Sequence, residues 1–436
     1  MKRRNPGLIT VLFCWLLALP LLSVYPLLPP ESFADFVNDF TREYESLDFP
    51  GYSIAYADNF ARLPGPDQLE RGASFSASFR KRLAEYPTSS LTPEQRIDYQ
   101  LIEYELNLLD QYLQLATSWR AADASIEPDV GLSKNYLGTA WYRYYLKRWI
   151  DQSVEPEQLM AFGHEQVARA HAGQARIQEA SGLDSIAFRE YLDAPVFFYQ
   201  DQKSVHRACV KLHERLAKTL DEYFPRLAEI PPLTIAAGTD PRLARVPGFY
   251  RDNTFFYNYF DRPFNKRQIG WLYVHEGLPG HHYERNYARQ FSRPTQVSSL
   301  FNYSAYTEGW GAYVEEIGGE YGAYPTPYDQ YGKWEWDLIR SLRVVMDVGL
   351  NYYDWSDEKA LAYWREHLSG LDDIGQREID RMRRWPAQVI TYKYGADRLL
   401  QFLREAKAQP DFNWKNFHER VLAYGPLPLT ILAEQL

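Results

Sequence analysis

The sequence predicts a large, mainly α-helical domain with minor β structure. Hydrophobic residues make up 45% and charged residues 24% of the 436-residue chain, which is typical of a folded protein with a large core. Apolar residues recur at helical spacing along most of the chain, whereas alternating strand patterns are few. Residues 225–264 are rich in Pro and Gly, and we expect them to form an irregular, functional loop because such long loops are uncommon in compact proteins.

The clearest predicted helix begins at Thr92-Pro93-Glu94-Gln95. Thr92 and Gln95 match a capping box, and Pro93 stands at the first helical position. Apolar residues then recur from Ile97 to Leu113, which predicts a helix that ends at about residue 115. Similar patterns predict further helices over residues 33–47, 67–85, 156–181, 203–224, 334–350, 357–369, 389–408 and 413–423.

The N-terminus has the layout of an export signal. Lys2, Arg3 and Arg4 precede an uncharged run from Leu8 to Leu28, with small residues soon after it. The run is longer than a usual signal core, so residues 1–34 are either a cleaved signal peptide or a retained membrane anchor. We expect residues 35–436 to form the exported domain, either periplasmic or anchored to the membrane and facing the periplasm.

Cysteines and net charge exclude several classes of protein. Cys14 follows the bulky Phe13 inside the apolar run, which disfavours lipid attachment there. Cys209 is the only cysteine beyond the leader, so the exported domain has no intrachain disulfide, and we expect this thiol to be buried. The net charge of −9 argues against a general nucleic-acid binder, because no basic excess is available to neutralise phosphates.

The stretch HEGLPGHH, residues 275–282, differs from the zinc-peptidase motif HExxH at one position. Pro279 stands where the second histidine belongs, and a proline there must end, kink or bulge the helix. On an unbroken helix His275 and His282 would lie about 10 Å apart along the axis, too far to share one zinc ion. If the Pro-Gly pair loops out, His281 becomes the second ligand.

A helix before the motif is indicated by Asn265. Asn265 and Gln268 match a capping pair, and Phe264 and Ile269 match a hydrophobic staple. We therefore expect this helix to begin at Lys266 and to carry the first histidine near its third turn.

A catalytic zinc site also needs a third ligand and a general base. Glu276, beside the first histidine, is the natural base for a metal-activated water. Glu308 lies 27 positions after His281 in TEGWGAYVEE and is the candidate third ligand. We interpret Glu315 and Glu316, farther along the same predicted helix, as a solvated face. A di-iron helical bundle is a competing metal site, but none of the nine histidines has Glu three residues before it.

Four ordered motifs resemble a bacterial family of exported proteins and predicted lipoproteins that is labelled as a domain of unknown function. The first two are HEGLPGHH and EGWGAY, residues 308–313, which resemble HExxPGHH and EGWALYxE. The others are RVVMDVGLN at 343–351 and EIDRMRRWPAQVITYKYG at 378–395, and the final GPLPLTILAEQL also resembles the family's usual end. The likeness covers residues 150–436 and is weaker before them.

The resemblance implies a mostly helical fold similar to gluzincin metallopeptidases of the thimet oligopeptidase type, with a zinc ion. By position, His275 and His281 resemble the histidine ligands, Glu308 the carboxylate ligand and Glu276 the base. Arg381 and Tyr392 fall on recurrent polar positions of the last motif. There they would steady the oxyanion of an attacked carbonyl, or else serve as buried hydrogen-bond anchors.

The chain departs from the family pattern at two positions. The family His at the end of the third motif is Asn351 here, and the family Gly after Pro386 is Ala387. Because Asn is neither an acid nor a base near neutral pH, a proton shuttle at that position would be lost or a substrate contact changed. We expect activity to be retained with altered specificity.

The sequence therefore predicts an exported zinc metallohydrolase that cleaves short peptides. Two alternatives belong to other classes. One is a non-catalytic exported binding protein that retains the fold. The other is a zinc amidase acting on cell-wall peptides or non-peptide amides.

Overall fold

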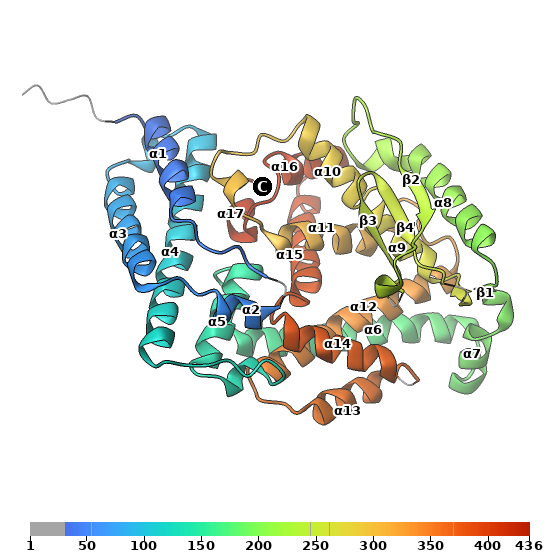
Figure 1. Ribbon diagram of the computed structural model, residues 1–436. Helices are drawn as coiled ribbons and strands as arrows, with labels where there is room; N and C mark the ends of the chain where they lie inside the picture. Colours follow the sequence, from blue (N-terminus) through green and yellow to red (C-terminus); the bar gives the residue numbers. More distant parts are fainter. Residues whose placement is uncertain (1–30, 54, 245, 261, 369) are drawn as a thin grey trace, which may run out of the picture.

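The mainly α-helical fold class is confirmed by a computed structural model, which describes residues 31–436 apart from residues 54, 245, 261 and 369 (Figure 1). Helices contain 65% and strands 4% of the described residues. The predicted leader at residues 1–34 lies almost entirely outside the described residues. Within the part that is described, no helix is both long and apolar enough to cross a membrane.

The blue and cyan end of the molecule in Figure 1 is a group of helices close to the N-terminus of the described chain. The capping box of Thr92 and Gln95 is present, with Pro93 at the first helical position. This helix extends past its predicted end because Ala116 and Trp119 still face the core. The helices are α1 (Phe33–Ser46), α2 (Tyr56–Ala61), α3 (Pro66–Leu83), α4 (Pro93–Ala121) and α5 (Gly138–Trp149).

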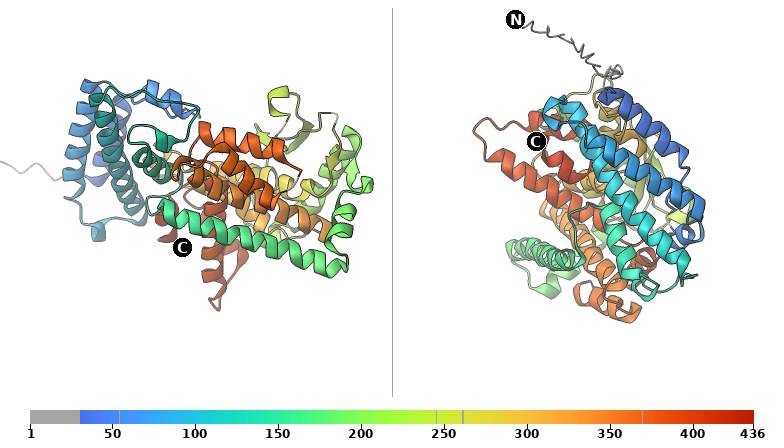
Figure 2. Two further views of the ribbon diagram at one scale, coloured as in Figure 1. Left: turned by 90° about the horizontal axis from the view of Figure 1, so that it is seen from below. Right: turned by 90° about the vertical axis from the view of Figure 1, so that its left-hand side faces the viewer.

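Two helix pairs form the middle of the molecule. The long helix α6 lies along α12, and α11 lies along α15, as two directions of view show (Figures 1 and 2). α12 begins seven residues before its predicted start because Thr326 and Asp329 form a capping box at its N-terminus. The central helices are α6 (Pro156–Ser181), α11 (Ser304–Glu316), α12 (Pro327–Asn351), α13 (Asp357–His367), α14 (Asp372–Arg384) and α15 (Ile390–Lys407).

The segment at 225–264, predicted to be irregular, contains a small sheet. β3 and β4 form a hairpin whose turn residues, Asp252 and Asn253, both have positive φ, as a tight hairpin turn requires. β2 adds parallel to β4, so the strand order is β2-β4-β3. The strands are β1 (Phe198–Tyr199), β2 (Thr234–Ala237), β3 (Gly248–Arg251), β4 (Thr254–Tyr257) and β5 (Phe264–Asn265), of which β1 pairs with β5.

The remaining helices complete the ends of the fold around the sheet and the C-terminus. Cys209 lies buried in α8, as predicted. The predicted start of the helix before His275 is wrong by two residues, because Asn265 accepts a hydrogen bond from the Arg267 backbone N–H (3.1 Å) instead of capping a helix. These helices are α7 (Ser185–Leu192), α8 (Gln202–Tyr223), α9 (Gln268–Glu276), α10 (His281–Gln290), α16 (Trp414–Leu422) and α17 (Leu429–Ala433).

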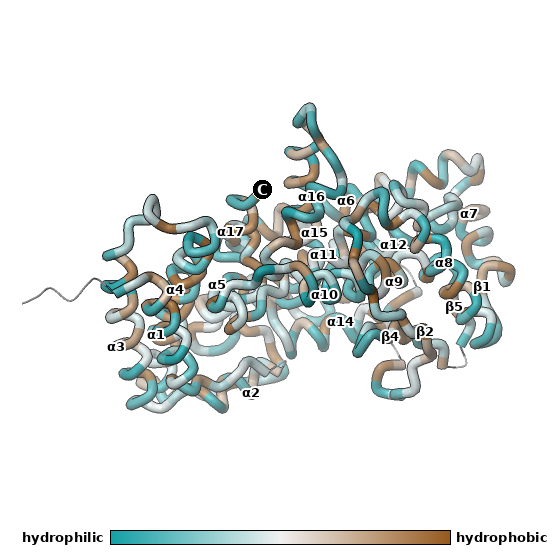
Figure 3. Tube along the Cα trace, turned by 90° about the horizontal axis from the view of Figure 1, so that it is seen from above, coloured by the Kyte–Doolittle hydropathy of each residue, from teal (hydrophilic) through white to brown (hydrophobic). Residues whose placement is uncertain are grey.

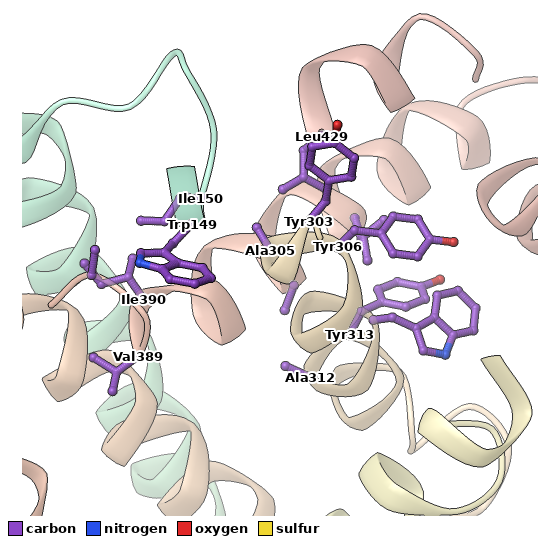
Figure 4. Close-up of a cluster of buried hydrophobic side chains, with 14 of the residues drawn as sticks. Trp149, Ile150, Tyr303, Ala305, Tyr306, Ala312, Tyr313, Val389, Ile390 and Leu429 are labelled. Carbon is purple, nitrogen blue, oxygen red and sulfur yellow. The ribbon is translucent and has the colours of Figure 1, made fainter. Parts of the chain in front are cut away.

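Helix α11 has two different faces inside the core. Hydrophobic and hydrophilic residues alternate along the helices in Figure 3, and Figure 4 shows Tyr306 and Tyr313 pointing from one side of α11 while Ala305 and Ala312 point from the other. The side of α11 that carries the small residues faces α15. A Cβ built on Gly309 would lie 2.6 Å from the Cα of Gly395. The two helices are therefore in backbone contact at this pair of glycines.

This contact predicts a stability effect of Gly309→Ala. The added methyl group meets backbone, so α11 and α15 must move apart, and overpacking of this kind costs about 1–3 kcal/mol. Urea unfolding followed by circular dichroism measures the change. Gly319→Ala is the matched control, since a Cβ there has no heavy atom within 4 Å. Equal unfolding free energies for wild type and Gly309→Ala would show that the helices are not in contact as described.

Candidate metal centre

The break predicted at Pro279 is present. α9 ends at Glu276, and α10 begins at His281 after a four-residue connection that includes a cis Leu278–Pro279 bond. The connection packs tightly, because a Cβ on Gly280 would lie 1.9 Å from the backbone oxygen of His275. Trp310 of α11 also donates a hydrogen bond to the carbonyl of Pro279 (3.0 Å). The two histidines therefore come from two helices joined by a fixed turn.

Three of the predicted site residues converge. Nε2 of His275 lies 3.7 Å and Nε2 of His281 lies 3.6 Å from Oε2 of Glu308, and the three potential ligand atoms all lie within 4.8 Å of one another. Ligand atoms that each lie about 2.1 Å from one tetrahedral zinc ion are separated by about 3.4 Å. Both histidines are buried, whereas the Glu308 side chain is 26% exposed. The cluster is thus accessible from the side of Glu308.

The cluster favours a positive charge at its centre. Burial disfavours ionisation of Glu308, but the adjacent imidazoles of His275 and His281 outweigh it and hold the pKa of Glu308 well below its usual value. Burial likewise disfavours the His275 imidazolium, yet the nearby Glu308 carboxylate and the hydrogen bond to Glu315 raise the pKa of His275 to about 9. A site that draws a proton in this way provides the negative charge that a divalent cation requires.

Glu315 orients the first histidine, a role that the sequence interpretation missed. Its carboxylate accepts a hydrogen bond from Nδ1 of His275 (2.7 Å), which leaves Nε2 directed at Glu308. Arg340 of α12 in turn pairs with Glu315 (2.5 Å). The interpretation of Glu315 as solvated is wrong, because it is 3% exposed. Two signals were available: Glu315 lies two helical turns after Glu308, and it takes the place of the last Glu in EGWALYxE.

Glu316 is also buried, contrary to the sequence interpretation. It pairs with Lys333 (2.6 Å), Arg169 (2.7 Å) and Lys393 (3.3 Å), which belong to α12, α6 and α15. Despite the desolvation caused by burial, these three cations hold the pKa of Glu316 well below its usual value. This ion cluster joins four helices behind the candidate site.

The predicted base and the predicted polar pair lie in a cavity of about 720 Å³ beside the cluster. Glu276 lines it, and burial raises the pKa of Glu276 while His275 and His281 act in the opposite direction. The Tyr392 ring stacks on the His275 ring with centroids 6.1 Å apart. Nη2 of Arg381 donates to the Tyr392 hydroxyl (3.3 Å). All six residues predicted for the site are therefore neighbours in the structure.

His282 is not part of the cluster. Its Nε2 donates to the carbonyl of Pro231 (3.0 Å), and its Nδ1 accepts from the Tyr250 hydroxyl (3.1 Å). Burial lowers the pKa of His282 to about 4, so it is neutral near pH 7. It attaches α10 to the segment before the sheet.

Asn351 and Ala387 lie away from the cluster, which removes the reason for expecting altered specificity. Asn351 is fully buried, accepts from the Leu132 backbone N–H (3.2 Å) and donates to the Met382 carbonyl (3.1 Å). Neither residue lines the cavity. Ala387 has φ of 70°, a conformation that glycine adopts without strain.

These features define a mainly helical protein whose buried pair of histidines and one glutamate open into a cavity lined by charged and aromatic side chains. The chain belongs to the family described as bacterial protein of unknown function (DUF885), whose model matches residues 107–436. This match confirms the prediction that the chain belongs to a bacterial family of unknown function.

Two solved structures share the fold. A putative lipoprotein of unknown function from Shewanella oneidensis is 16% identical, with a TM-score of 0.70, over 93% of this chain and 99% of that chain. A putative lipoprotein from Colwellia psychrerythraea is 20% identical, with a TM-score of 0.64, over 93% of this chain and 73% of that chain. No curated protein matches the chain.

The buried Asp347 near Asn351 predicts a pH-dependent stability. Burial raises its pKa to about 7, although hydrogen bonds from Tyr142 (2.7 Å) and the Ala387 N–H (3.0 Å) act in the opposite direction. Because the folded state holds this proton more tightly than the unfolded state, its stabilising contribution is lost as pH rises from about 4 to about 7. Asp347→Asn should gain stability relative to wild type over this range, by at most about 1.4 kcal/mol per pH unit.

Urea unfolding between pH 4 and 8 tests this expectation. Asp411→Asn, at an exposed position, is the control. Its free energy of unfolding should differ from that of wild type by a constant amount across the pH range. If the unfolding free energies of Asp347→Asn and wild type differ by the same amount at every pH, the expectation is contradicted.

Proposed function

We propose that this protein is a zinc-dependent hydrolase that cleaves amide bonds in short peptides. The observation that supports the proposal is the convergence of His275, His281 and Glu308 on one point beside a cavity. Two imidazoles and one carboxylate are a donor set typical of catalytic zinc, which keeps a fourth position for water. When bound, zinc would supply an activated water near neutral pH and polarise the substrate carbonyl.

Glu276 is the proposed general base. It is the last residue of α9, directly after the ligand His275, and it lines the same cavity. A carboxylate in this position accepts the proton of the attacking water and passes it to the leaving amine.

Tyr392 is the proposed oxyanion donor. Its ring stacks on His275, and its hydroxyl accepts a hydrogen bond from Arg381, so the phenolic proton is free to point into the cavity. An O–H group held in this way stabilises the negative charge that develops on the attacked carbonyl. Arg381 positions Tyr392 and adds positive charge.

The substrate class follows from the size of the cavity and from the resemblance to gluzincin metallopeptidases, which we carry into this proposal. A volume of about 720 Å³ accommodates a short peptide segment and excludes a folded chain. We also propose that the protein is exported, on the basis of the predicted leader at residues 1–34 and of two structural neighbours described as putative lipoproteins.

Two variants test the proposal, one that should lose peptide turnover and one that should lose the bound zinc. Glu276→Gln should keep zinc and lose turnover of a short-peptide library by about 100-fold or more, because only the base is removed. His281→Ala should lose the zinc. Atomic absorption of the purified protein and mass spectrometry of the digests measure both effects. Glu320→Gln, at an exposed position of similar chemistry, is the control. A Glu276→Gln variant that digests the library at the wild-type rate would refute the assigned base.

Glu315→Gln should weaken zinc binding without abolishing it. The amide oxygen can still accept from Nδ1 of His275, but the charge that supports this imidazole and pairs with Arg340 is lost. Changes of such outer partners cost about 10–100-fold in metal affinity. Competition with a chromophoric chelator measures the affinity, with Glu320→Gln again as the control. Identical affinities for Glu315→Gln and wild type would show that the second carboxylate does not support the ligand.

A further inference from the structure

The cavity beside the candidate metal centre carries an excess of positive charge. Among the described residues, seven arginines and four carboxylates line it, although the whole chain has a net charge of −9. Three of these arginines are neutralised by carboxylates: Arg242 pairs with Asp240 (2.7 Å), Arg340 pairs with Glu315 (2.5 Å), and Arg343 forms two hydrogen bonds of 2.9 Å with Glu378. Positive charge that a substrate can use must therefore come from the other arginines of the cavity walls.

Helix α14 presents a row of arginines to this cavity. Arg377, Arg381 and Arg384 are spaced by four and three residues, so they share one face of the helix, and all three line the cavity. Arg377 lies 3.1 Å from Glu378, the carboxylate that already pairs with Arg343. One carboxylate therefore serves two arginines at this wall.

Arg381 is held by neutral groups. Nη2 donates to the amide oxygen of Gln388 (2.7 Å) and to the hydroxyl of Tyr392 (3.3 Å). Among the described residues no acceptor binds its Nε or Nη1, and neither atom is buried without a partner, so this edge of the guanidinium has access to solvent. Arg384, one turn farther along, forms no ion pair with any described residue. Two donor-rich groups thus face the cavity without a carboxylate of their own.

We infer that Arg381 and Arg384 bind a carboxylate of the substrate close to the bond that is cleaved. The inference rests on the proposed peptidase function and names its substrate class. The planar edge of a guanidinium matches a carboxylate with two parallel hydrogen bonds. A peptide carries such a group either at its C-terminus or on an acidic side chain.

The position of Arg381 sets the distance between this carboxylate and the metal centre. The guanidinium carbon lies 5.8 Å from the Tyr392 ring centroid, which is 6.1 Å from the centroid of His275. The two distances together place Arg381 within about 12 Å of the His275 ring. An extended peptide covers this distance in about three or four residues. A C-terminal carboxylate bound here places an amide bond within a few residues of the C-terminus at the metal centre.

Binding of matched peptides tests the inference. The probes are a neutral tetrapeptide with a free C-terminal carboxylate, the same peptide as a C-terminal amide, and the amide with one internal glutamate. Isothermal titration calorimetry with the Glu276→Gln variant measures affinity without turnover. The free acid should bind about tenfold or more tightly than the plain amide. If instead the glutamate-containing amide binds tightly and the free acid binds no better than the plain amide, the carboxylate comes from a side chain. Equal or undetectable binding of all three peptides would overturn the inference.

Variants of the two arginines assign the preference to them. Arg384→Gln should reduce the preference for the acid to about threefold or less, and Arg381→Lys should also reduce it because lysine keeps the charge and loses the planar edge. Arg226→Gln, at an exposed arginine outside the cavity, should keep the full preference. A preference that persists in both cavity variants would overturn the assignment.

Turnover by the wild-type protein separates this inference from the proposed function. Tighter binding of the acid without cleavage of any peptide would support the carboxylate subsite and refute the hydrolase. Cleavage of acid and amide with equal kcat/KM would support the hydrolase and refute the subsite.

Discussion

The backbone contact between Gly309 and Gly395 is the constraint on which the candidate site depends. Glu308 precedes the first glycine on α11, and Tyr392 lies one turn before the second on α15. Because neither glycine has a side chain, the two helices approach closely enough for Glu308 and Tyr392 to act on the same point. The proximity also has an electrostatic effect, since burial and, after it, the Glu308 carboxylate raise the pKa of the Tyr392 hydroxyl. Larger residues at this crossing would separate the candidate ligand Glu308 from Tyr392, the proposed oxyanion donor.

Buried charge is concentrated on α11, and each charge has a partner on another helix. Glu308 meets the two histidines of α9 and α10, Glu315 meets Arg340 of α12, and Glu316 meets cations of three helices. A buried ion without its partner costs several kcal/mol, so each of these charges is stabilised only when the helix that carries its partner is packed against α11. The same ion pairs therefore stabilise the packing of the helices and set the charges at the candidate site.

Much of the fold was predictable because its long helices bury one regular apolar face. The helices around residues 93–121 and 156–181 follow the periodic pattern and the capping residues closely. Helix α14 was missed because arginines and carboxylates dominate its sequence, although its few buried residues, such as Ile379 and Met382, recur at helical spacing. The sheet within residues 225–264 was missed because its strands are short and because β2 pairs with β4 rather than with β3, the next strand in the sequence.

The candidate ligands were predictable because chemistry restricts which residues can hold zinc, and the proline break restricts which histidine comes next. Glu315 was not, since an acidic residue near the end of a helix is usually solvated and only the packing of α12 makes it a buried partner of His275. The opposite error arose at Asn351, where a departure from the family pattern implied a change in chemistry. In the structure this amide is buried, bridges two backbone groups by hydrogen bonds, and does not line the cavity.

The proline also changes what holds the two histidines at the right separation. In HExxH a single helical turn sets the spacing, whereas here His275 and His281 belong to different helices and the turn between them is held by Trp310 of α11. Helix α11 also supplies Glu308 and, through Glu315, the orientation of the first imidazole. The candidate metal centre therefore cannot be complete in an isolated α9–α10 hairpin. It forms only when α11 has packed between that hairpin and α15, which makes the metal geometry a consequence of tertiary packing.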